Sequence, residues 1–175
     1  RETMIKRILK SMALASALFC AVSQAAPTLT LTPAGGAISG APGATVGWGF
    51  TLTNPTDYLV VTSAIFTPVT TLGTFTDFVS TFNFFVVGPA PDSTSVSQTF
   101  DVLSQTGIGS FAIDAGAAVG AVASGQIALT YDLFSLSPND PLFDPGRDGL
   151  SFGNTLAANA SVTVSPIPEP GNVLL

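Results

Sequence analysis

The sequence predicts an all-β protein, an antiparallel β-sandwich of immunoglobulin-like type, with a jelly roll as the alternative. Composition is the first reason. Hydrophobic residues make up 46% of the 175 residues and charged residues only 9%, too apolar for a disordered chain and too poor in Glu, Lys and Arg for long surface helices. The second reason is a series of short alternating runs that end at Gly and Pro, typical of strands joined by tight turns.

The clearest strands are expected in the N-terminal half. Residues 28–32 alternate Thr with Leu. Residues 45–53 alternate as well, and one face of this strand carries the large apolar side chains of Val46, Trp48, Phe50 and Leu52. A turn signal follows, so residues 58–66 are predicted to be the partner strand of 45–53.

The C-terminal half continues the same pattern. Further strands are predicted at 75–78, 82–87, 95–102, 109–114, 126–134 and 158–164. Residues 115–124 fit two descriptions. Their Ala content suits a helical turn, whereas Gly116, Gly120 and the absence of charge favour a loop that crosses between sheets.

The aromatic residues are expected mainly in the core. Trp48 lies on the apolar face of an alternating strand, which favours a core anchor over the alternative, a platform that stacks sugar rings. The run that contains Phe82, Phe84 and Phe85 must turn at least one ring outward.

Charge and side-chain inventory exclude several functions. From Ala26 onward one basic residue, Arg147, stands against ten acidic ones, so binding to nucleic acid or to anionic lipid by the folded domain is excluded. This part of the chain also has no His, Cys or Lys, which rules out Ser–His–Asp catalysis and zinc sites built on His or Cys. A hydrolase could be built only on a pair of Asp carboxylates, and we expect no enzyme.

The N-terminal segment is predicted to be a secretory signal peptide. A basic stretch after Met4 precedes the apolar run 12–22, and the small residues Ser23 and Ala25 suit signal peptidase, with cleavage after Ala25. A retained membrane anchor is the alternative, but the run has about half of the roughly 20 residues that a spanning helix needs. Residues 1–25 are therefore set apart from a β-sandwich domain at 26–165.

The C-terminal segment, residues 166–175, carries a second export signal. Pro168-Glu169-Pro170 follows the last predicted strand and is followed by an apolar start, Val173-Leu174-Leu175. This arrangement resembles the PEP-CTERM sorting signal of exosortase substrates, and a plain Pro-rich linker is the alternative. In that family a transmembrane helix and an Arg-rich tail follow the motif, so we expect the signal to be cut off before its span is complete.

The resemblance implies a non-catalytic surface or extracellular-matrix protein. Its processing partners would be signal peptidase and an exosortase-like enzyme, and its source a Gram-negative bacterium with an exopolysaccharide or biofilm matrix. Contact with the membrane would be confined to the terminal signals. The alternative function is a carbohydrate-binding or adhesive β-sandwich module, assisted by calcium.

One loop supplies the calcium hypothesis. Residues 137–149 contain hard oxygen ligands on a backbone shaped by Pro and Gly, and the candidate ligands are Asn139, Asp140, Asp144 and Asp148. Their spacing does not match an EF-hand loop. The alternative is a long turn in which Asp side chains cap backbone amides and Arg147 pairs with a neighbouring carboxylate.

Overall fold

The chain folds as two packed β-sheets, which confirms the predicted antiparallel β-sandwich. The structure is a computed structural model that describes residues 26–80 and 84–167. The first sheet has the strand order β1 (Thr28–Thr32), β3 (Thr45–Thr53), β8 (Gly109–Ile113), β5 (Gly73–Asp77), and β7 (Ser95–Gln98) also pairs with β3. The second has the order β2 (Ala37–Gly40), β10 (Gly149–Val164), β9 (Val122–Phe134), β4 (Tyr58–Pro68), β6 (Val86–Val87).

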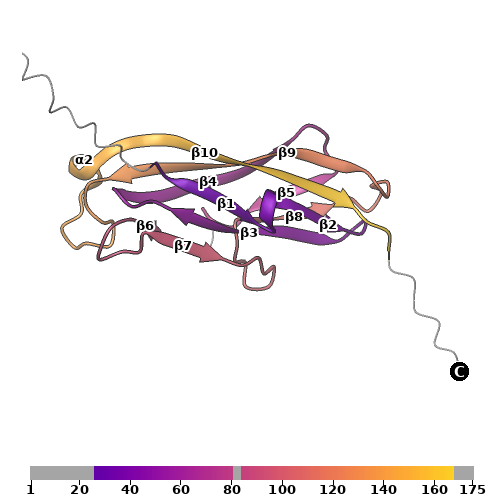
Figure 1. The fold of residues 1–175 in the computed structure, drawn as a ribbon, viewed down its shortest axis with the longest axis horizontal. Helices are drawn as coiled ribbons and strands as arrows, with labels where there is room; N and C mark the ends of the chain where they lie inside the picture. The colour runs from indigo at the N-terminus through magenta and orange to yellow at the C-terminus, as the bar shows by residue number, and fades with distance from the viewer. Residues whose placement is uncertain (1–25, 81–83, 168–175) are drawn as a thin grey trace, which may run out of the picture.

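Consecutive strands lie in opposite sheets along most of the chain. The strands from β1 to β6 alternate between the two sheets, and among the described residues only β9 and β10 form a hairpin within one sheet. The two run side by side along the length of the molecule (Figure 1). The predicted pairing of 45–53 with 58–66 is therefore wrong, since β4 pairs with β9 and β6 in the other sheet. Alternation identifies a strand, but the pairing partner depends on contacts distant in sequence.

The core lies between the sheets and is built from the predicted apolar faces. Strands β1 and β3 have the predicted bounds, and Trp48, Phe50 and Leu52 are at most 1% exposed. Trp48 packs against Phe66 of β4, with ring centroids 5.1 Å apart. The core-anchor interpretation of Trp48 is thus confirmed.

Several predicted bounds need correction. Strand β10 begins at Gly149, nine residues before the predicted start, and β2 was not predicted at all. The predicted strand 82–87 is reduced to β6 within the described residues. Phe84 is 69% exposed, as expected for one ring of its run. Residues 115–124 contain a loop that crosses from β8 in one sheet to β9 in the other, and β9 begins at Val122.

The predicted strand 95–102 is interrupted. Strands β7 and β8 lie in turn along β3, β7 opposite Phe50–Thr53 and β8 opposite Thr45–Trp48. The residues between them leave the sheet as a small projection, closed by the bridge between Asp101 and Thr106. Phe100 of this projection covers Gly47, where a Cβ atom would come within 2.2 Å of the ring. Glycine is therefore required at that point of β3.

Candidate functional site

The loop predicted to bind calcium ends in the short helix α2 (Pro145–Asp148), and its carboxylates cap backbone amides. Asp144 is the N-cap residue of α2, and its Oδ1 accepts hydrogen bonds from the backbone N–H groups of Gly146 and Arg147 at 2.8 and 3.3 Å. Asp140 Oδ1 accepts one from the Leu142 N–H at 2.8 Å. These are the local bonds that favour Asp at turns and helix N-termini.

Asp148 is held by an ion pair. Its carboxylate receives hydrogen bonds from Arg147 Nε at 2.9 Å and Nη2 at 2.8 Å, and from the Asp144 backbone N–H at 2.9 Å. These bonds hold the pKa of Asp148 below its usual range, the Arg147 side chain being the main cause. The same pair raises the pKa of Arg147.

The four candidate calcium ligands do not converge on one point. Asn139 Nδ2 donates instead to Asp92 Oδ1 at 2.9 Å, and Ser137 Oγ donates to the other oxygen of Asp92. Within the described residues, no group of three or more His, Cys, Asp or Glu side chains is arranged to hold a metal ion. The geometry is that of the capped turn, and calcium binding stays a prediction.

Both sheets carry exposed polar side chains that hydrogen-bond between neighbouring strands. On the first sheet, Thr28 of β1 lies opposite Thr53 of β3 with their hydroxyls hydrogen-bonded, and Thr51 pairs with Ser97 of β7 at 2.7 Å. On the second, Gln126 Nε2 donates to Asn159 Oδ1 at 3.2 Å. A sugar-binding face would be expected to present a row of exposed rings, and at these positions the sheets present hydroxyl and amide groups instead.

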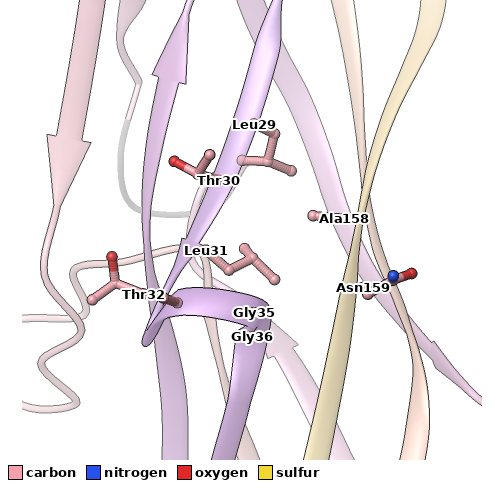
Figure 2. Close-up of a pocket in the computed structure, with 9 residues that line it drawn as sticks. Leu29, Thr30, Leu31, Thr32, Gly35, Gly36, Ala158 and Asn159 are labelled. Atoms are coloured by element: carbon pink, nitrogen blue, oxygen red, sulfur yellow. The ribbon is translucent and has the colours of Figure 1, made fainter.

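One side of the sandwich, which we call the open side, contains a hollow of about 620 Å³ between β1 and β10. Leu29 and Leu31 of β1 point across it toward Ala158 of β10, whereas Thr30 and Thr32 point the other way (Figure 2). No charged residue lines the hollow, and none occurs in β1, β2 or β10. The alternation of residues 28–32 is visible in the sequence, but the hollow beside this strand is not.

The backbone edges at the open side are largely unpaired. Strand β1 pairs with β3 on one edge, and no strand among the described residues pairs with its other edge. Strand β10 pairs with β9 along most of its length, but β2 covers its opposite edge only over Ser161–Val164. Two free strand edges therefore border one uncharged hollow.

The short 3-10 helix η1 (Ala34–Gly36) closes one end of the hollow, where the chain crosses from β1 to β2. The buried Trp48 Nε1 donates a hydrogen bond to the Gly36 carbonyl at 2.7 Å. Gly36 has φ +67°, and a Cβ atom there would lie 2.3 Å from the Asn159 carbonyl oxygen. Only glycine allows this approach of the crossover to β10.

On the opposite side, which we call the closed side, the carboxylate of Asp77 links the two sheets. Asp77 at the end of β5 accepts a hydrogen bond from the Ala64 backbone N–H of β4 at 2.9 Å, which joins the two sheets. It also accepts bonds from the Val79 and Ser80 N–H groups at 2.8 and 3.3 Å and from the Ser80 hydroxyl. The free amide of β4 is thereby satisfied.

The helix α2 lies at one end of the sandwich (Figure 1), and apolar side chains form a cluster near it. The buried Phe134 contacts Phe143 and Phe152 edge-on, at centroid distances of 5.1 and 5.9 Å. Phe152 is 62% exposed, and the neighbouring Leu142 and Leu150 are also exposed.

The predicted processing sites lie outside the described residues. This applies to Ser23 and Ala25 at the signal-peptide cleavage site and to the sorting motif Pro168, Glu169 and Pro170. Over residues 26–80 and 84–167, no helix is long and apolar enough to span a membrane.

The known proteins found to resemble this chain are solved structures of low similarity. No family model and no curated protein matches the chain. Among solved structures, the sixth cohesin from Acetivibrio cellulolyticus scaffoldin B in complex with a Cel5 dockerin is similar at 11% identity and a TM-score of 0.30, over 81% of this chain and 100% of that one. CaCohA2 from Clostridium acetobutylicum matches at 22% identity and a TM-score of 0.25, over 79% and 91%. At such TM-scores these likenesses carry no argument about function.

Proposed function

We propose that this protein is an exported, non-catalytic surface or extracellular-matrix protein, processed by signal peptidase after Ala25 and by an exosortase-like enzyme near Pro168-Glu169-Pro170. The observation that carries the proposal is the position of the two sites relative to the fold. Strand β1 begins at Thr28 and β10 ends at Val164, so both cuts would leave every strand of the sandwich in place. The side-chain inventory supports the non-catalytic part, because the segment from Ala26 onward lacks His, Cys and Lys.

The sorting proposal is tested on the gene and on its product. The coding sequence after Leu175 is expected to add an apolar span that brings the segment to about 18–20 residues, followed by an Arg cluster, and a polar stop would contradict this. In a host with an exosortase-like enzyme, mass spectrometry of the released protein is expected to find Ala26 at its N-terminus.

A matched pair of variants then separates the motif from the linker. Glu169→Ala is expected to leave the protein in the membrane fraction, whereas Pro166→Ala, two residues before the motif, is expected to be released like the wild type. Equal release of the two variants would favour the linker interpretation.

An adhesive module is the second candidate, and the uncharged hollow between two free strand edges favours it. The carbohydrate-binding form of this hypothesis is tested by co-sedimentation of the protein with neutral and acidic exopolysaccharide, with and without calcium. Calcium-dependent retention, abolished by Asp144→Asn and kept by Asp132→Asn on β9, would establish the calcium-assisted form. No retention on any polysaccharide would remove it.

A further inference from the structure

Strand β1 is an exposed sheet edge that carries neither a charged residue nor a bulge to prevent edge pairing. Its outward residues Thr28, Thr30 and Thr32 are exposed, and its second edge has no partner strand among the described residues. Natural edge strands are commonly protected by Lys, by inward-pointing charges or by bulges. The strand has no charged residue and no break in its register with β3.

The sequence around this edge reads the same in both directions. Residues 27–33 are Pro-Thr-Leu-Thr-Leu-Thr-Pro, with Thr30 at the centre. When two copies pair antiparallel about Thr30, Leu29 lies opposite Leu31 of the other copy and Thr28 opposite Thr32. The side chains of directly opposed residues share one face of a sheet, so the Leu residues of both copies would stay on the core side.

The flanking prolines limit the possible registers. Proline has no N–H to donate, so pairing through this edge cannot extend beyond Pro27 or Pro33. A shift by one residue would place Thr opposite Leu and turn apolar side chains outward. The register centred on Thr30 keeps all five residues paired.

Charge also directs a second copy to this side. The chain from Ala26 onward has a formal charge of −9, so two copies repel each other over most of their surface. The elements that form the open side, β1, η1, β2 and β10, contain no charged residue. Two copies that meet at this side therefore bring no strands with carboxylate side chains close to each other.

We propose that two copies of this protein pair antiparallel through β1, about a two-fold axis at Thr30, so that the first sheets of both copies become continuous. The occupant of the free edge is thus a second copy of the chain, in the strand-addition mode of recognition. The pairing is independent of the sorting proposal, since it concerns only the folded sandwich.

The interface is small, and its strength is predicted to depend on salt. Five residues per copy bury much less than the roughly 1,200–2,000 Å² of a stable interface, so the dimer forms at high protein concentration. Since the copies are both acidic, salt screens their repulsion, and the dimer fraction rises with ionic strength.

Cysteine cross-linking tests the register. Cys20 is the only cysteine of the chain, so a full chain with Cys20→Ser carries only the thiol that is introduced. In the proposed dimer the two Thr30 Cα atoms lie about 4.5–5.5 Å apart, within the range of a disulfide. Thr30→Cys is therefore expected to double the mass on a non-reducing gel after mild oxidation.

Two controls carry the same substitution elsewhere. Thr28→Cys lies on the same edge and face, but its Cα atom would be about 14 Å from that of its copy, so it is expected to stay monomeric. Thr74→Cys places the thiol on β5 at the closed side and is expected to stay monomeric too. Equal cross-linking of Thr28→Cys and Thr30→Cys would overturn the register and with it the proposal.

Sedimentation equilibrium of the unmodified chain provides a test that needs no variant. The average mass is expected to rise toward twice the monomer mass with concentration, and to rise further from low to high salt. A monomer at all concentrations and salt levels overturns the proposal.

Discussion

The two sides of the sandwich differ in how the edges of the sheets are managed. On the closed side the Asp77 carboxylate reaches from β5 to the backbone of β4 and satisfies its free amide. On the open side the backbone itself crosses between the sheets at η1, and Trp48 and Gly36 hold that crossover in place. A side chain can close an edge at one point, whereas the crossover leaves the second edge of β1 and most of the second edge of β10 without a partner strand among the described residues. The difference shows that one sandwich can have a sealed side and a side able to accept another strand.

The largest loss of stability is expected from substitutions of Trp48, a core residue whose indole N–H bonds to the crossover at the open side. Trp48→Ala removes a fully buried ring and is predicted to lower the free energy of unfolding by about 3–5 kcal/mol. Trp48→Phe keeps most of the ring but leaves the Gly36 carbonyl unsatisfied, which is predicted to cost about 1–3 kcal/mol. Urea unfolding measures both, and an unchanged stability of Trp48→Phe would show that the crossover does not depend on the indole N–H.

The next largest loss of stability is expected at the crossover, where two glycine substitutions separate the cost of backbone strain from the cost of packing. Gly35 and Gly36 both have positive φ, but only Gly36 has β10 within reach of a Cβ atom. Gly35→Ala is predicted to cost about 1–2 kcal/mol for the left-handed conformation alone. Gly36→Ala is predicted to cost about 1–3 kcal/mol more than this, because its Cβ atom would overpack the contact with β10. Equal melting temperatures for the two variants would contradict a tight contact between η1 and β10.

On the closed side, Asp77→Ala leaves the buried Ala64 amide without an acceptor. The predicted loss is about 1–3 kcal/mol, and hydrogen exchange of the Ala64 amide is expected to accelerate. Thr76→Ala, the exposed neighbour in β5, serves as the control and should change stability by less than about 0.5 kcal/mol. Unchanged exchange at Ala64 in Asp77→Ala would show that another group seals this side.

The smallest change in stability is expected at α2, which belongs to neither the open side nor the closed side. The lowered pKa of Asp148 means that its contribution to stability is present at neutral pH, above the pKa of the unfolded chain. This contribution is lost as the pH falls through the lower pKa of the folded state. Asp148→Asn should therefore be slightly less stable at pH 7 and lose less stability on acidification from about pH 5 to 2. Parallel pH profiles for variant and wild type would contradict the ion pair as the cause.

Some of this architecture was readable from local pattern. The bounds of β1 and β3 and the burial of Trp48 were predicted correctly, because side chains alternate between the faces of a strand within a few residues. The start of β10 was missed because Gly149 and Gly153 interrupt the alternation, while pairing with β9 continues past them. The interruption after Gln98 was missed because Thr99–Val102 continues an apolar pattern that is used outside the sheet, with Phe100 over Gly47.

In the loop predicted to bind calcium, too, the sequence predicted the local contacts but not the distant one. Asp side chains in a turn rich in Pro and Gly commonly cap backbone amides. The capped-turn alternative therefore predicted the roles that Asp140 and Asp144 have in the structure. The participation of Asp92 could not be foreseen, because it reaches Asn139 from 47 residues away.

The sequence by itself determined that this protein is an all-β chain with an alternating core and without His, Cys or Lys from Ala26 onward. These are properties of residue type and short-range order. Only the tertiary structure decided which strands pair, and it put β3 and β4 in opposite sheets and left one edge of β1 and most of one edge of β10 without a partner strand in the described part of the chain. Strand pairing is a contact between distant segments, which local alternation permits with many partners and only the packed core selects.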